Sequence, residues 1–260
     1  LATPFFVFWG WLSDKVGRKP IILAGCLIAA VAYFPLFHAL ADAANPRLTA
    51  ATASAPVTVR ADPADCHLQF DPVGKTVFNH SCDLAKSYLA KAGVTYTNVE
   101  APAGTVAQVR IGDQAVVQSF RGDAMAPADF AAEKKAWDKQ LGEALTAAGY
   151  PAKADSDLVN KPMVVLILFI LGFYVTMVYG PIAAALVEMF PTNIRYTSMS
   201  LPYHIGNGWF GGFLPTTAFA IVAATGNIYS GLWYPIVVAL GTVVLGFLLV
   251  KEGKDVDLNA

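Results

Sequence analysis

Charge is scarce in this sequence, and its scarcity excludes an ordinary soluble domain. Only 14% of the 260 residues are Asp, Glu, Lys or Arg, whereas 55% are hydrophobic and the mean hydropathy is +0.49. Soluble globular domains carry about 25% charged residues. The composition therefore predicts a membrane protein.

Residues that build catalytic, metal and nucleic-acid sites are also few. The chain has three cysteines and four histidines. Its hydrophilic middle holds no Gly-rich phosphate loop, no nucleophile with a neighbouring base and no cluster with metal-ligand spacing. A basic stripe interleaved with aromatic residues is missing as well. We therefore expect no enzyme activity, no cofactor, no bound metal and no nucleic-acid partner.

The beginning of the sequence lacks the signs of a complete N-terminus. Leu1 stands in the middle of an apolar run, with no initiator Met and no basic segment followed by a cleavage site. We expect the chain to be the C-terminal part of a longer protein.

The charges that are present divide the chain into parts. The segment from Ala41 to Lys161 holds 12 of the 18 Lys and Arg residues and 14 of the 19 Asp and Glu residues. Residues 20–41 carry none and would span about 33 Å as a helix, enough to cross a bilayer. We therefore expect four parts: 1–41, the end of one transmembrane helix, a cytoplasmic loop and the next helix; 42–161, an insert outside the membrane; 162–250, three transmembrane helices; and 251–260, a cytoplasmic tail.

The insert is predicted to be a small α+β domain that follows a linker over residues 42–63. Its strand-like segments, rich in β-branched and apolar residues, are 66–70, 94–99, 106–111 and 115–120. Segments 82–92 and 127–148 have helical composition.

Two of the three cysteines, Cys66 and Cys82, belong to the insert. A disulfide between them would stabilise a small domain by about 3 kcal/mol. The alternative is a metal site that also uses the neighbouring His67 and His80. Because Cys66 and His67 are adjacent, they are poorly spaced as two ligands of one ion, and the disulfide is favoured.

The remaining cations indicate the orientation in the membrane. If the apolar segments alternate in direction, all six Lys and Arg residues outside the insert fall on one side of the membrane; they are Lys15, Arg18, Lys19, Arg195, Lys251 and Lys254. By the positive-inside rule this side is cytoplasmic, and long loops are exempt from the rule. The insert is then periplasmic or extracellular.

Three motifs resemble one known family. Residues 10–19, GWLSDKVGRK, resemble the G-x-L-[AS]-D-[RK]-x-G-R-[RK] loop of the major facilitator superfamily, in its second copy between the eighth and ninth helices. Residues 188–195, EMFPTNIR, resemble the E-x-F-P-T-x-x-R segment that ends the tenth helix. Residues 203–215 are similar to the eleventh helix of the metabolite:proton symporters. Family members usually have only a short loop where this chain has its insert.

The resemblance implies a fold and a function. The fold would be an α-helical membrane protein, the C-terminal helical bundle of the superfamily, here with a small α+β periplasmic insert. The function would be proton-coupled transport of a small organic solute, such as a carboxylate, proline or betaine, by alternating access across a bacterial inner membrane. Its partners would be the solute, protons, the lipid membrane and the N-terminal half of the same transporter.

Four charges at predicted cytoplasmic helix ends suggest a gate. An ionised side chain at the membrane boundary is costly unless it is paired. We expect a crossed network in which Arg18 pairs with Glu188 and Asp14 pairs with Arg195. The alternative is that all four are ordinary boundary charges that set the topology.

Polar side chains within the apolar segments are candidates for solute or proton contacts. His204 could carry a proton, or it could simply hydrogen-bond a neighbouring helix at the interface, which we favour. The solute candidates supply polar groups on largely apolar segments, which suits a central cavity. Aromatic packing would also explain these residues. The candidates are Tyr174, Thr176, Tyr179, Tyr203, Asn207 and Trp209.

Two further functions stay open at the level of the sequence. The insert could be a solute-binding or partner-binding module carried by a transporter-like anchor. The protein could also be a facilitator or an exporter of the same superfamily.

Overall fold

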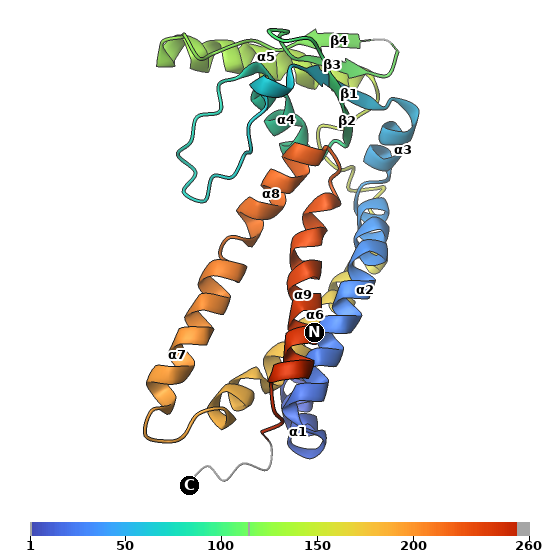
Figure 1. Cartoon of the computed structure of the whole chain (residues 1–260). Helices are drawn as coiled ribbons and strands as arrows, with labels where there is room; N and C mark the ends of the chain where they lie inside the picture. Colours follow the sequence, from blue (N-terminus) through green and yellow to red (C-terminus); the bar gives the residue numbers. More distant parts are fainter. Residues whose placement is uncertain (1, 114, 254–260) are drawn as a thin grey trace. The chain divides into compact units, whose positions relative to one another are not determined.

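The computed structural model describes residues 2–113 and 115–253 and divides the chain into two compact units (Figure 1). The bundle unit comprises residues 1–40, 161–214 and 232–260, and the insert unit comprises residues 41–160 and 215–231. Of the expected cytoplasmic tail, residues 254–260, with Lys254, lie outside the described residues.

Four helical segments are long and apolar enough to cross a membrane, so the chain is a multi-pass α-helical membrane protein. The short helix α1 (Pro4–Val16) precedes them. The four segments are α2 (Arg18–Ala44), α6 (Lys161–Glu188), the run of α7 (Arg195–Ile205), η2 (Gly206–Gly211) and α8 (Leu214–Thr225), and η3 (Ser230–Leu232) with α9 (Trp233–Leu249).

Close contact between α1 and α6 depends on a glycine. A Cβ atom at Gly180 would lie 3.1 Å from both the Phe6 carbonyl oxygen and the Trp9 Cβ, closer than most side-chain contacts. Aromatic rings of the two helices then interlock, with the Phe5 and Phe173 centroids 5.0 Å apart. Although Pro181 follows Gly180, α6 continues through it to Glu188.

The insert unit contains a four-stranded sheet in the order β2-β1-β3-β4. β1 pairs in parallel with β2, and the other two pairings are antiparallel. The parallel pair is joined by the crossover helix α4, as parallel strands require. The strands are β1 (Val57–Ala61), β2 (Tyr96–Glu100), β3 (Gln108–Ile111) and β4 (Ala115–Gln118); the helices are α3 (Pro46–Ser54), η1 (Pro63–Asp65), α4 (Ser81–Lys91) and α5 (Pro127–Ala147).

One face of this sheet forms the core of the insert. Val57, Val59 and Val109 point into it from the two central strands, and Leu89 and Leu141 meet them from α4 and α5. The alternate residues on the strands, such as Arg60 and Arg110, are exposed. The core therefore has two layers, with helices on one side of the sheet.

Two predictions about the insert are wrong. The expected linker over residues 42–63 contains the end of α2, the helix α3 and β1, which is a central strand of the sheet. The expected strand over residues 66–70 does not form, because this segment leaves the sheet after η1 and enters the connection to α4.

The edge strand β2 holds the end of α8 within the insert unit. The Tyr96 hydroxyl donates to the Ala223 carbonyl at 2.6 Å, and the Asn98 amide donates to the carbonyls of Ala224 and Thr225 at 3.1 and 3.2 Å. The Tyr96 N–H also donates to Gly226, whose φ of 82° turns the chain away. These contacts satisfy carbonyl groups that a helix end leaves without partners.

The two ends of the insert meet. The Asn160 N–H donates a hydrogen bond of 2.9 Å to the Ala43 carbonyl, close to where α2 ends and α6 begins.

Candidate functional site

A single residue connects α1 and α2 and brings the charges of the 10–19 motif together. Although this motif is expected to be a loop, residues 10–16 belong to α1, and α2 begins at Arg18. Gly17 makes the connection with φ 106°, a conformation that side chains disfavour. The motif is therefore a helix–glycine–helix corner, which places Asp14 and Arg18 one turn apart.

Arg18 is the centre of this corner. Its guanidinium donates to Glu188 Oε1 from Nε at 3.1 Å and from Nη2 at 3.0 Å, so the expected pair with the end of α6 is formed. Nη1 forms an ion pair with Asp14 and donates to the Ser13 hydroxyl at 2.6 Å. Ser13 is fully buried and donates onward to the Gly10 carbonyl. Charge-assisted bonds of this kind are among the strongest that side chains make.

The other half of the crossed network is not formed. Asp14 pairs with Arg18 in its own corner, and the Arg195 Nε donates to the Phe190 carbonyl at 3.0 Å. The expectation of an Asp14–Arg195 pair is therefore corrected, because Arg195 lies at the first position of α7 and caps the turn that precedes it.

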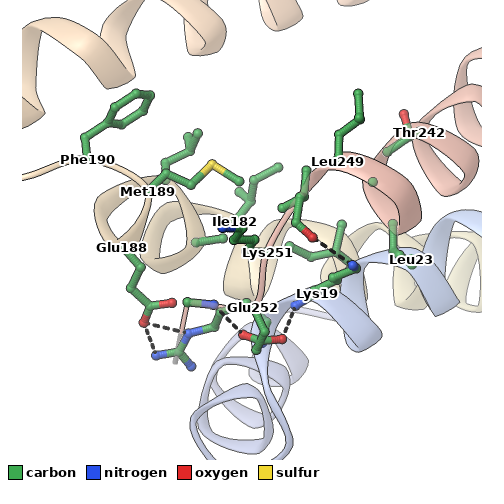
Figure 2. Close-up of a pocket in the computed structure, with 17 residues that line it drawn as sticks. Lys19, Leu23, Ile182, Glu188, Met189, Phe190, Thr242, Leu249, Lys251 and Glu252 are labelled. Carbon is green, nitrogen blue, oxygen red and sulfur yellow. Dashed lines mark hydrogen bonds and ion pairs between the residues drawn. The ribbon is translucent and has the colours of Figure 1, made fainter. Parts of the chain in front are cut away.

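Glu252 takes a place that the sequence did not indicate. Its carboxylate accepts from the backbone N–H of Arg18 at 2.9 Å and of Lys19 at 3.0 Å, the exposed donors at the start of α2. Lys19 reaches back to α9, where its ammonium donates to the carbonyls of Phe247 and Val250 at 2.9 and 2.7 Å. Figure 2 shows Glu188 and Glu252 meeting the start of α2. The only sequence signal was the pair Lys251-Glu252 directly after the last apolar run.

A cavity of about 580 Å³ lies beside these charges in the bundle unit (Figure 2). Arg18, Lys19, Glu188 and Glu252 line its polar side, and residues of α2, α6, α9 and the segments directly after α6 and α9 line the rest. The Glu188 side chain is only 10% exposed, and its Oε2 has no hydrogen-bond partner among the described residues. One carboxylate oxygen is thus available to a water molecule or an ion.

The structure separates the solute candidates into two groups. Tyr179, Tyr203 and Asn207 line a second cavity of about 420 Å³, and the Tyr179 hydroxyl lies 3.4 Å from Asn207 Oδ1. Tyr174, Thr176 and Trp209 are not among the lining residues. Thr176 is buried and donates within its own helix to the Phe173 carbonyl, and Trp209 is 68% exposed.

His204 does not line this cavity either. Its Nδ1 lies 2.8 Å from the Ser200 carbonyl one turn earlier in α7. This contact lies within α7 itself, whereas the favoured interpretation expects a hydrogen bond to a neighbouring helix.

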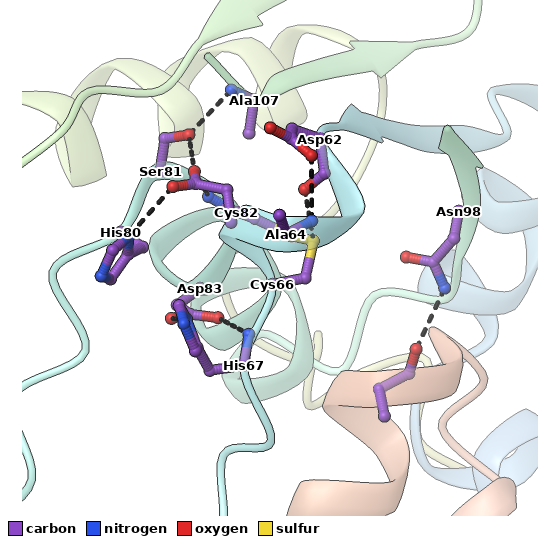
Figure 3. The surroundings of a disulfide bond; sticks show 12 residues. Asp62, Ala64, Cys66, His67, His80, Ser81, Cys82, Asp83, Asn98 and Ala107 are labelled. Atoms are coloured by element: carbon purple, nitrogen blue, oxygen red, sulfur yellow. Dashed lines mark hydrogen bonds and ion pairs between the residues drawn. A yellow bond between two sulfur atoms is a disulfide. The ribbon is translucent and has the colours of Figure 1, made fainter. Parts of the chain in front are cut away.

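In the insert unit, Cys66 and Cys82 form a disulfide with a Cα–Cα distance of 5.1 Å (Figure 3). The histidines beside them bind carboxylates: His67 Nδ1 lies 2.8 Å from Asp83, and His80 Nδ1 lies 3.0 Å from Asp65. No group of three ligating side chains occurs in the described part of the chain.

Asp65 is the buried centre of this region. Burial disfavours its charged form, but hydrogen bonds from Ser81, His80 and the Cys82 N–H outweigh that cost and lower its pKa. The carboxylate thereby ties η1 to the start of α4, next to the disulfide.

Comparisons with known proteins agree with the motifs. Residues 144–259 match the family model described as "Sugar (and other) transporter". A protein of Staphylococcus haemolyticus named as a proline/betaine transporter is 33% identical over 98 residues, 37% of this chain and 21% of that protein. A metabolite transport protein of Haemophilus influenzae is 35% identical over 101 residues, 38% and 23% of the two chains. The citrate-proton symporter of Klebsiella pneumoniae is 32% identical over 95 residues, 35% and 21%.

These matches cover only about a fifth of each relative's length. No solved structure matches the chain significantly. The relatives are transporters rather than enzymes, as the sequence predicted. The 10–19 motif lies outside the segment matched by the family model and carries a resemblance to transporters of its own. The membrane part of this chain is therefore similar to transporters, in agreement with its resemblance to the major facilitator superfamily.

Proposed function

We propose that this chain is part of a secondary transporter that moves a small organic solute, such as a carboxylate, proline or betaine, by alternating access coupled to protons. The observation that carries the proposal is the ionic cluster around Arg18, which joins α1, the start of α2, the end of α6 and the segment after α9. In this proposal the cluster closes one face of the bundle and opens when its ion pairs separate.

The orientation is part of the proposal. The cluster would lie at the cytoplasmic face of a bacterial inner membrane, with residues 42–161 in the periplasm and the C-terminal tail in the cytoplasm. The positive-inside distribution of the cations supports it. An N-terminal half, with the surrounding lipid, would complete the transporter.

The second cavity is the proposed contribution of this chain to the solute site. Its lining is mostly apolar, with the polar tips of Tyr179, Tyr203 and Asn207. Such a lining suits a small solute that is held by a few hydrogen bonds. Tyr174, Thr176 and Trp209 would act only through packing, and His204 stays a proposed, less favoured proton carrier.

Uptake measurements on the full-length transporter test this function. Cells are given labelled citrate, proline or betaine with and without an uncoupler. We expect uptake of one solute that the uncoupler abolishes, and uptake that persists with the uncoupler would indicate facilitated diffusion instead. Asn207→Ala should raise KM, whereas the matched change Tyr196→Phe should not, because Tyr196 is 84% exposed and lies outside the cavity.

A second candidate function is a solute-binding or partner-binding insert. The specific observation is that β2 of the insert holds the end of α8, so that binding to the insert would act directly on a membrane helix. A thermal shift of the whole protein with candidate solutes, resolved by hydrogen exchange in the insert, tests it. A fragment of residues 62–157 expressed alone would not test this function, because it lacks β1, a central strand of the sheet.

A further inference from the structure

The connection between the two cysteines exposes large apolar side chains. This disulfide loop, residues 67–80, runs from Cys66 to the start of α4 without regular structure. Leu68 is 67% exposed, Val73 69% and Val77 65%. Single exposed apolar residues are common, but several on one loop mark a surface that contacts something less polar than water.

The loop is held in shape at its base. The disulfide closes it, and the His67 N–H and the Gln69 amide donate to Asp83 at 2.7 and 2.8 Å. Farther out, the Asp71 carboxylate accepts from the N–H groups of Gly74 and Thr76, both at 2.9 Å. These hydrogen bonds restrain the backbone of the loop that carries the exposed apolar side chains.

The base of the loop lies next to the end of a membrane helix within the same unit. Cys66 and Ala224 line one cavity of about 230 Å³, and Ala224 is the last apolar residue of α8. Figure 1 shows the loop (cyan) leaving the insert on the side from which α8 also leaves the sheet. With α8 embedded in a bilayer, a loop on this side of the insert would lie near the lipid headgroups.

The charges of the loop permit this position. Between His67 and His80 the only carboxylate is Asp71 and the only ammonium is Lys75. The Asp71 carboxylate is already satisfied by backbone donors, and a lysine side chain can extend to the headgroups while its stem stays in an apolar layer.

We propose that the disulfide loop inserts Leu68, Val73 and Val77 into the interfacial layer of the bilayer beside α8, with lipid as its partner. The loop would then fasten the insert to the membrane at a second point, besides the contact of β2 with α8. This inference rests on the proposed embedding of α8 in the membrane.

Spin labels test the proposal on the whole protein in vesicles of phosphatidylethanolamine and phosphatidylglycerol. Leu68, Val73 and Val77 are changed to Cys one at a time in a Cys26→Ser background, and mass spectrometry verifies that the Cys66–Cys82 disulfide is intact. The collision rates of each label with oxygen, which concentrates in lipid, and with a water-soluble nickel chelate are then compared.

We expect the oxygen-to-nickel ratio at these three positions to exceed severalfold that of a label at Val116. This control residue is 57% exposed on β4, the strand at the opposite edge of the sheet from β2. Ratios equal to that at Val116 would overturn the proposal, and so would labels shielded from both reagents, which would mean contact with protein. A label at Ile221 on α8 separates the two proposals: a water-like ratio there would contradict the embedding itself.

Discussion

Removing the arginine of the ionic cluster should cost more than removing either of its acids. Arg18 and Glu188 have side chains that are 12% and 10% exposed, whereas Asp14 is 63% exposed. The change Arg18→Met leaves the buried Glu188 carboxylate without a partner among the described residues. Breaking a buried ion pair in this way costs about 3–5 kcal/mol. The lower end applies, because Glu188 lines a cavity that water can enter.

The changes at the acids should be milder because Arg18 has several partners. Glu188→Gln leaves the guanidinium its ion pair with Asp14 and its bond to Ser13, so we expect a loss of about 1.5–3 kcal/mol, the worth of charged hydrogen bonds. Asp14→Asn should cost less than about 1 kcal/mol, as exposed pairs do.

Hydrogen exchange measures these losses at the helix ends that the cluster holds together. The readout is the free energy of opening for backbone amides around residues 13–19 in the whole protein. A loss of about 3 kcal/mol accelerates exchange roughly 100-fold, because each 1.4 kcal/mol is a factor of ten. Asp14→Asn should accelerate it less than about fivefold.

A double variant supplies the decisive control. Arg18→Met with Glu188→Met removes both buried charges, and such replacements are often close to neutral. We therefore expect the double variant to be more stable than Arg18→Met alone. A double variant less stable than the single one, or an Asp14→Asn loss as large as that of Arg18→Met, would refute this account of the cluster.

Three further predictions concern backbone, disulfide and pH. Gly17→Ala should destabilise the corner by about 1–3 kcal/mol, because φ at this position is 106° and an added Cβ would collide with the Glu252 carboxylate. Thermal unfolding of the bundle measures this loss. Gly241→Ala is the control, because a Cβ atom added there meets no neighbouring atom within 4 Å. Cys66→Ala with Cys82→Ala should lower the stability of the insert by about 3 kcal/mol, or its Tm by about 10 °C, whereas Cys26→Ser should leave it unchanged. Because folding of the insert lowers the pKa of Asp65, the ionised carboxylate stabilises the insert above about pH 4, and this stabilisation is lost as pH falls through the lowered pKa. Asp65→Asn should therefore reduce the loss of insert stability at acidic pH. An unchanged dependence of stability on pH would contradict this role of Asp65.

The membrane part was predictable because the length of each apolar segment can be read directly from the sequence. The expected span over residues 20–41 lies within α2, and three further helical segments long enough to cross a bilayer lie where residues 162–250 were expected to hold three. The corner at Gly17 was missed because the polar residues 13–15 suggested a loop, although their spacing also suits a last helical turn. β1 was hidden in an Ala-rich stretch that has linker composition and becomes a strand only through pairing with β2 and β3.

The site was predictable only where each of the two partners belonged to a motif. Arg18 and Glu188 each belong to a recognisable segment, so their pairing could be anticipated. Glu252 accepts from backbone N–H groups, and Ser13 accepts from Arg18 through its buried hydroxyl. No spacing in the sequence predicts either contact. The Asp14–Arg195 pair failed for a related reason, because proximity in sequence gave Asp14 a nearer partner.

The hydrogen bond between Asn160 and Ala43 shows that the chain enters and leaves the insert at neighbouring points. Since its entry and exit lie side by side, the chain could gain or lose the whole domain while the ends of α2 and α6 keep a separation that a short turn can bridge. Excision would expose the carbonyls of residues 223–225 to water, which can satisfy them in place of Tyr96 and Asn98. We therefore expect the ends of α2 and α6 to tolerate removal of the domain.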